Sequence, residues 1–190
     1  MNIFEKLMLA KQMSFSDGEI ELMGQRMVFY PSSLVALLTK DINDNPALKS
    51  QLYFSTKESM VSGGFGSNVG KLYGFTFRDY ANWFVDLAQL AGWGRIRWVE
   101  LDEEKAYGVI DVEESPVSQY MKGIARSPCD HVVRGFFAGG ASSAFRKEVD
   151  SVEIECLAMG AEKCRFIIDS REGLEMKFAE LVRQQLWVRR

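Results

Sequence analysis

Cysteine and histidine are scarce in this chain of 190 residues, which contains three cysteines and one histidine. An odd number of cysteines does not fit a framework of paired disulfides, so the sequence predicts a reducing, cytoplasmic environment. A single histidine, His131, leaves no arrangement of serine, histidine and aspartate for nucleophilic catalysis. No nicotinamide or flavin fingerprint is visible either, so we expect no catalytic residues and a binding protein rather than an enzyme.

Long apolar stretches and an excess of positive charge are also missing. No apolar run approaches the roughly 20 residues that a membrane-spanning helix needs. The first residues lack the basic segment and apolar core of a secretory signal. The formal net charge of −3 argues against direct binding of nucleic-acid phosphates. The length and the 47% hydrophobic content are typical of one soluble globular domain.

The hydrophobic pattern predicts paired strands that alternate with helices. Residues 1–14 are expected to form a short helix or an arm, and residues 15–190 a single domain that closes with a C-terminal helix. Within it we expect hairpins over 18–30, 95–112 and 149–168, and helices over 31–40, 47–61, 76–91, 116–123, 128–145 and 174–186. Hairpins interrupted by helices indicate an α+β fold in which helices pack on an antiparallel sheet.

Glycines and aromatic residues are concentrated in the middle of the chain. Five glycines lie between residues 62 and 74, but no strand precedes them and no Lys-Ser/Thr pair follows, so a phosphate-binding loop is not expected. A segment of this kind could gate an apolar ligand pocket between helices and sheet. The candidate lining residues are Tyr73, Phe77, Tyr80, Trp83, Phe84 and Trp98. Ordinary core packing is the alternative for each of them.

The three cysteines suggest a metal site. Cys156 and Cys164 lie eight residues apart across a turn at Gly160, a carboxylate precedes Cys156 by three residues, and Cys129 lies upstream. Three thiolates and one carboxylate can fill the four positions of a tetrahedral zinc site. Three buried free thiols are the alternative, because free cysteine is among the most buried residue types.

Several short sequences resemble the 4-vinyl-reductase-type domain family, also called the predicted hydrocarbon-binding domain. They are Pro31-Ser32-Ser33-Leu34, Gly92-Trp93-Gly94, Glu114-Ser115-Pro116, Ser127-Pro128-Cys129, Gly135-Phe136-Phe137-Ala138-Gly139 and Glu153-x-x-Cys156-x-x-x-Gly160-x-x-x-Cys164-x-Phe166. The resemblance implies an α+β fold related to subunits of the TRAPP vesicle-tethering complex, usually dimeric. It also implies a structural Zn²⁺ held by Cys129, Glu153, Cys156 and Cys164.

The fourth ligand has two candidates. Side chains two apart share a face of a regular strand, so Glu153 and Glu155 would point together and Cys156 away from them. A site that uses Glu153 with Cys156 therefore requires a bulge or a strand end between them. His131 is the alternative fourth ligand.

The resemblance favours a zinc-containing binding domain for a small apolar or aromatic ligand, acting as a sensor or carrier, with a partner protein. Phenol-responsive members of the family anchor the ligand hydroxyl with a histidine and a tryptophan. The only histidine here follows Cys129 by two residues, so recognition of phenol is not transferred to this chain. Two alternatives are a dimeric scaffold without a ligand and an accessory protein of tetrapyrrole metabolism.

Overall fold

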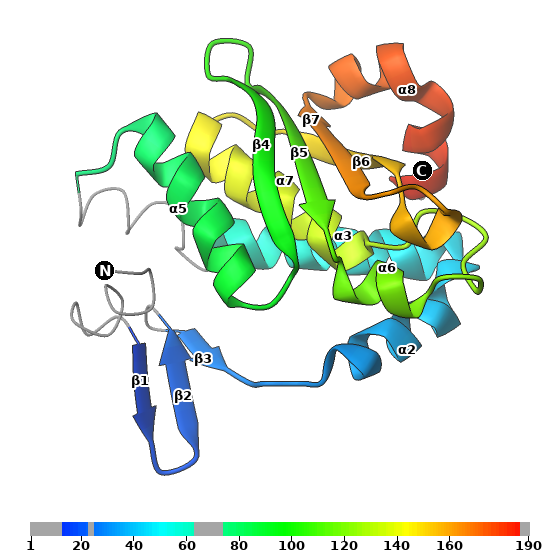
Figure 1. Ribbon diagram of the computed structural model, residues 1–190. Helices are drawn as coiled ribbons and strands as arrows, with labels where there is room; N and C mark the ends of the chain where they lie inside the picture. Colours follow the sequence, from blue (N-terminus) through cyan, green and yellow to red (C-terminus); the bar gives the residue numbers. More distant parts are fainter. Residues whose placement is uncertain (1–12, 23–24, 63–73, 187–190) are drawn as a thin grey trace.

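The computed structural model describes residues 13–22, 25–62 and 74–186. The helices and strands of these residues form two antiparallel sheets with helices packed around the larger one (Figure 1). In chain order they are β1 (Met13–Ser16), β2 (Glu19–Leu22), β3 (Gln25–Met27), α2 (Ser32–Asn43), α3 (Pro46–Ser62), α5 (Phe77–Leu90), β4 (Arg95–Asp102), β5 (Tyr107–Glu113), α6 (Pro116–Tyr120), α7 (His131–Phe145), β6 (Asp150–Glu155), the 3-10 turn η1 (Leu157–Met159), β7 (Cys164–Asp169) and α8 (Arg171–Gln185).

The central sheet has the strand order β4-β5-β7-β6, and every neighbouring pair is antiparallel. Alternate residues of a strand face opposite sides of a sheet. Ile110 and Phe166 accordingly lie in the main core with α5 and α7, whereas Val109 and Ile167 pack in a second cluster with Leu174 of α8. The predicted α+β class with an antiparallel sheet is confirmed.

The close approach of α3 and α7 depends on glycine. A Cβ atom added at Gly139 would lie 2.6 Å from the carbonyl oxygen of Lys57, and one added at Gly140 would collide with the ring of Phe84. Small residues in α7 therefore let its backbone approach α3 directly. The glycine-rich part of 128–145 packs within the chain, and this helix carries the segment before β6 to the edge of the sheet (Figure 1).

Local signals account for several boundaries. Thr76 caps α5, and its hydroxyl and the Asp79 carboxylate form a reciprocal capping box, as the sequence pattern predicts. The predicted serine cap at the start of α2 is wrong, because Pro31 occupies the cap position and no side chain bonds the first turn there. The predicted hairpin over 18–30 is also incomplete, since Met13–Ser16 pairs with β2 and makes a sheet of three strands.

A buried carboxylate ties the outer face of the central sheet together. Asp111 accepts hydrogen bonds from Arg97 at 3.0 Å, Lys163 at 2.7 Å and Arg165 at 2.7 Å. Burial opposes ionisation of Asp111, but the hydrogen bonds from Arg165 and Lys163 outweigh it and lower the pKa of its carboxyl. The pairs join β4, β5 and β7 next to Cys164, the first residue of β7. Among the described residues, no helix is both long and apolar enough to cross a bilayer.

Candidate metal centre

The four predicted metal ligands come from three separate stretches of the chain. Cys129 lies in the irregular segment before α7, Glu153 lies in β6, Cys156 follows the end of β6, and Cys164 begins β7. All four residues are buried. A 3-10 turn and Gly160, which has a φ of 95°, reverse the chain between Cys156 and Cys164. This tight reversal brings the two thiols together.

The predicted irregularity in β6 is present. The pairing of β6 with β7 shifts between Glu153 and Glu155, as in a β-bulge. Glu153 is completely buried, whereas the side chain of Glu155 is 39% exposed and pairs with Arg165. The bulge therefore separates two carboxylates that a regular strand would direct to the same side.

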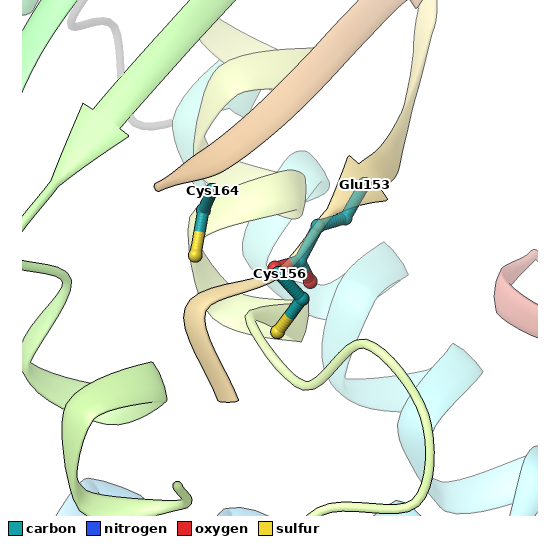
Figure 2. A group of neighbouring side chains, drawn as sticks. All are labelled: Glu153, Cys156 and Cys164. Atoms are coloured by element: carbon teal, nitrogen blue, oxygen red, sulfur yellow. The ribbon is translucent and has the colours of Figure 1, made fainter. Parts of the chain in front are cut away.

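The distances suit a small metal ion. Carboxylate and sulfur atoms of Glu153, Cys156 and Cys164 lie within 4.8 Å of one another, and Figure 2 shows the three side chains directed into one space beside the ends of β6 and β7. The sulfur of Cys129 lies 4.0 Å from that of Cys156. Zinc–sulfur bonds of about 2.3 Å in a tetrahedron place two sulfurs about 3.8 Å apart. The cluster thus has nearly the spacing that zinc requires.

The hydrogen bonds of Glu153 are incomplete. Its Oε2 accepts a hydrogen bond from the backbone N–H of Asp130 at 3.1 Å, while its Oε1 is buried and has no partner among the described residues. Burial, followed by the charge of Asp130, raises the pKa of Glu153 well above its usual value. An unsatisfied buried carboxylate oxygen costs free energy unless a cation or a donor faces it. This oxygen is the strongest indication that the cluster is built to hold a metal.

The thiols share protons in a way that a metal would replace. Hydrogen bonds from Cys129 and Cys164 lower the pKa of Cys156, so its thiolate is the favoured charge of the group. The same hydrogen bonds, together with burial, raise the pKa values of Cys129 and Cys164. A divalent cation favours the thiolate form of a coordinating cysteine. The donor set therefore fits zinc.

Ser118 is a functional candidate that the sequence pattern did not reveal. Its hydroxyl lies 3.5, 3.4 and 3.3 Å from the sulfurs of Cys129, Cys156 and Cys164, and it donates a hydrogen bond to Asp130 at 2.8 Å. Ser118 belongs to α6, whose position depends on Ser115 as its N-cap. The Glu114-Ser115-Pro116 sequence was the only signal that pointed to this helix.

Asp130 was also missed. Its carboxylate is buried and accepts hydrogen bonds from Ser115 at 2.9 Å and from Ser118. Burial raises the pKa of Asp130 to about 6. The backbone of Asp130 bonds Glu153 while its side chain bonds α6, so this residue holds the two sides of the cluster in register.

His131, the alternative fourth ligand, is directed away from the cluster. Its Nδ1 accepts a hydrogen bond from Arg134 at 3.0 Å, and because arginine only donates, the proton of the neutral ring lies on Nε2. Nε2 donates to Asn43 of α2 at 2.8 Å. Burial, followed by the charge of Arg134, lowers the pKa of His131 well below its usual value. Both ring nitrogens are occupied, so Glu153 is the better candidate.

A buried chain of hydrogen bonds supports Glu153 from behind. Gln185 at the end of α8 accepts from the backbone N–H of Glu153 at 2.9 Å and donates to its carbonyl at 2.8 Å. Arg134 donates to the carbonyl oxygen of Gln185 at 3.0 Å and lies over the ring of Tyr53. These contacts fix the backbone of β6 at the position of the candidate ligand.

The structure brings together most of the residues predicted to line a ligand pocket. Tyr80, Trp83 and Phe84 are buried in α5, and they belong to the same continuous apolar cluster as the three cysteines. Phe77 stacks on Phe145 at the edge of this cluster. Trp98 donates from Nε1 to the carbonyl oxygen of Ala81. Tyr73 lies outside the described residues.

One polar atom in this aromatic region has no partner. The hydroxyl of Tyr80 is buried and makes no hydrogen bond to a described residue, and burial raises its pKa above the usual value. The ring of Trp83 lies 5.7 Å away between centroids. Two surface grooves of about 490 and 460 Å³ lie elsewhere, beside Lys57 of α3 and beside Lys177 of α8, and neither is lined by the predicted pocket residues.

Comparison with known proteins agrees with this fold and this segment. The family model of the vinyl-4-reductase domain matches residues 109–170, a stretch that contains all four candidate metal ligands. The resemblance to the 4-vinyl-reductase-type family is thereby confirmed over these residues. No curated protein matches the sequence significantly.

Three solved structures share the fold. The phenol-responsive sensory domain of the transcription activator PoxR, solved with phenol, is 22% identical with a TM-score of 0.74, and the match covers 96% of this chain and 97% of that domain. A vinyl-4-reductase family protein from Methanocaldococcus jannaschii is 18% identical with a TM-score of 0.51, covering 75% of this chain and 83% of that one. Subunit 3 of the trafficking protein particle complex from Naegleria fowleri, covalently bound to palmitic acid, is 15% identical with a TM-score of 0.52, covering 72% and 88%. The expected likeness to TRAPP subunits is confirmed.

Proposed function

We propose that this protein is a zinc-containing binding domain for a small apolar or aromatic molecule and acts as a sensor or carrier. The observation that carries the metal assignment is the meeting of three buried thiols with the unpartnered Oε1 of Glu153. Bound zinc would supply positive charge among groups that otherwise compete for protons. Four protein ligands leave no position open for water, so the role would be structural or regulatory rather than catalytic.

The same site supports a cytoplasmic location. Cys129, Cys156 and Cys164 are free and buried, and each is assigned to the metal. Disulfide formation between any two of them would remove ligands from the site. A reducing compartment preserves all three as thiols or thiolates.

The ligand part of the proposal rests on the buried hydroxyl of Tyr80. A buried hydroxyl without a hydrogen bond is unfavourable, and a small molecule with one polar group would satisfy it. The surrounding rings of Phe75, Trp83 and Phe77 offer apolar contact to the rest of such a molecule. The phenol bound by the PoxR sensory domain and the palmitic acid bound by the trafficking subunit support a ligand of this general class.

A ligand among these rings would be felt at the metal centre. The aromatic residues and the three cysteines pack in one buried cluster. Phe84 stacks on Phe136 of α7, and Phe137, the next residue, contacts Phe166 of β7 two residues after Cys164. A ligand that prefers one arrangement of this packing would shift the population toward it, which is how a sensor domain transmits occupancy.

Mass spectrometry and thermal unfolding test the proposal. We expect native spectra of the purified chain to show one zinc ion per chain, and a panel of aromatic, isoprenoid and tetrapyrrole ligands to contain members that raise the melting temperature. Tyr80→Phe keeps the ring and removes the hydroxyl, so it should weaken binding of ligands that carry a polar group and spare purely apolar ones. A folded, metal-free chain with three free thiols would refute the zinc assignment. A panel without any stabilising ligand would refute the sensor or carrier role.

A dimeric scaffold is the second candidate function. The burial of Tyr80, Trp83 and Phe84 favours it, because these side chains already pack as a core without a ligand. The likeness to a trafficking complex subunit supports a homodimer in either case. A zinc-containing dimer that no small molecule stabilises would favour the scaffold.

A further inference from the structure

The N-terminal quarter of the chain leaves an unusual amount of apolar side chain exposed. Phe29 is 69% exposed, Tyr30 64% and Leu38 58%. We define the N-terminal apolar surface as these residues and four exposed neighbours. Its members are Phe15, Val28, Phe29, Tyr30, Leu34, Leu37 and Leu38. A patch of this kind on a soluble protein marks an interaction site.

The small sheet contributes the first part of this surface. In the register of β1, β2 and β3, Phe15 lies opposite Ile20 and Ile20 opposite Met27, so these side chains share one face. The opposite face carries serines, glutamates and Arg26, with an ion pair between Arg26 and Glu19. Met13 and Leu22 at one end of the apolar face touch the main core, but Phe15 at the other end is half exposed. A small sheet of this size needs cover on its apolar face to be stable.

Helix α2 contributes the second part. Ala36, Thr39 and Asn43 face the body of the protein and are buried. Leu34, Leu37 and Leu38 follow the 3.6-residue period of another side, and they are exposed. A helix with apolar residues on both sides is typical of one buried on both sides. The connector that joins β3 to α2 is extended and lies away from the central sheet (Figure 1).

We propose that the N-terminal apolar surface is the place where a second copy of this chain docks. The seven side chains offer roughly 500–700 Å² per copy, judged from their exposure and the area that a full aromatic or aliphatic side chain buries. A symmetric pair would therefore bury roughly 1,000–1,400 Å², which reaches the area of a specific interface. A two-fold axis pairs the same patch from both copies, and an uncharged apolar patch is complementary to itself.

The charge of the segment disfavours a membrane as the occupant. Asp17, Glu19, Glu21 and Asp41 outnumber Arg26 and Lys40 between residues 13 and 43. Anionic lipid surfaces attract segments with an excess of lysine and arginine, and this segment has the opposite sign. The inference deepens the homodimer of the proposed function by naming its surface.

The position of α2 also connects the surface to the metal centre. Asn43, at the end of α2, accepts from His131 and donates to Ser127, and these residues lie on either side of Cys129. α2 packs against α6, which carries Ser118. A dimer formed through α2 would therefore hold both elements that border the cysteines.

Sedimentation velocity of the full chain over a range of concentrations tests the surface. The wild-type chain of 21.6 kDa is expected to sediment as a dimer at micromolar concentration. Phe29→Glu and Leu38→Glu should each weaken dimerisation at least about 100-fold, because every substitution places two charges in the symmetric interface. Met176→Glu, the same change at a 79% exposed residue of α8, is the control and should leave the dimer intact.

Hydrogen exchange of the wild-type chain provides a reading that does not depend on variants. Amides of residues 28–38 should become more protected when the concentration is raised through the dimerisation range. A wild-type monomer at all concentrations would overturn the homodimer as well as its surface. A dimer that persists in both glutamate variants, or that shows no added protection over 28–38, would overturn this surface alone.

Discussion

Replacing Glu153 by glutamine should make the protein lose most of its response to zinc without destabilising the metal-free form. Glutamine keeps the size of the side chain and an oxygen that can accept from the N–H of Asp130. It removes the charge whose burial is unfavourable in the absence of a cation. The metal-free variant should therefore be at least as stable as the metal-free parent.

The loss on the zinc side follows from linkage. Removing a partner that only supports a ligand typically weakens metal binding about 10- to 100-fold, and removing the ligand itself should do no less. Each factor of ten corresponds to about 1.4 kcal/mol of stabilisation at a fixed metal concentration. For a chain of this size the melting temperature in zinc should fall by about 3–10 °C relative to wild type.

The assay is thermal unfolding in buffered free zinc and in excess chelator, with metal content measured on the same samples. Glu155→Gln is the matched control, because it makes the same chemical change two residues away on a side chain that is 39% exposed. Its ion pair with Arg165 is near the surface and should contribute less than about 1 kcal/mol. If Glu153→Gln keeps the full zinc-induced shift, or if Glu155→Gln loses it, the assignment of the fourth ligand is refuted.

Three further outcomes are expected from other parts of the structure. Ser118→Ala should lower zinc affinity about tenfold in competition with a chromogenic chelator, since its hydroxyl touches all three sulfurs, and Ser118→Thr should restore it; equal affinities would contradict this role. Gly140→Ala should lower the free energy of unfolding by about 1–3 kcal/mol in urea, because its Cβ would collide with Phe84, and an unchanged midpoint would contradict that packing. Asp111→Asn should cost about 1–2 kcal/mol at pH 7, and because the folded-state pKa of this carboxyl is lowered, the deficit should shrink as the pH falls from about 4 through that pKa; a deficit independent of pH would contradict it.

Local sequence chemistry predicted most of the secondary structure. The Thr76–Asp79 pair predicts the start of α5, because both halves of a capping box lie within four residues. The three-residue spacing of Glu153 and Cys156 predicts an irregularity in β6, since a regular strand would separate the two side chains. The first strand of the small sheet was missed because Met13-Ser14-Phe15-Ser16 is too short to distinguish from an arm without its partner strand.

The metal centre divides in the same way. The sequence alone, with the family resemblance, determined the four candidate ligands, because cysteines are few and the ligand spacing is local. Only the tertiary structure decided between Glu153, Glu155 and His131, because the choice depends on burial and on partners such as Asn43, 88 residues away from His131. It also revealed Ser118 and the exposed face of α2, since one acts through residues brought together by folding and the other by what folding leaves uncovered. Hydrogen-bond partners and solvent exposure are properties of packing, and no local pattern encodes them.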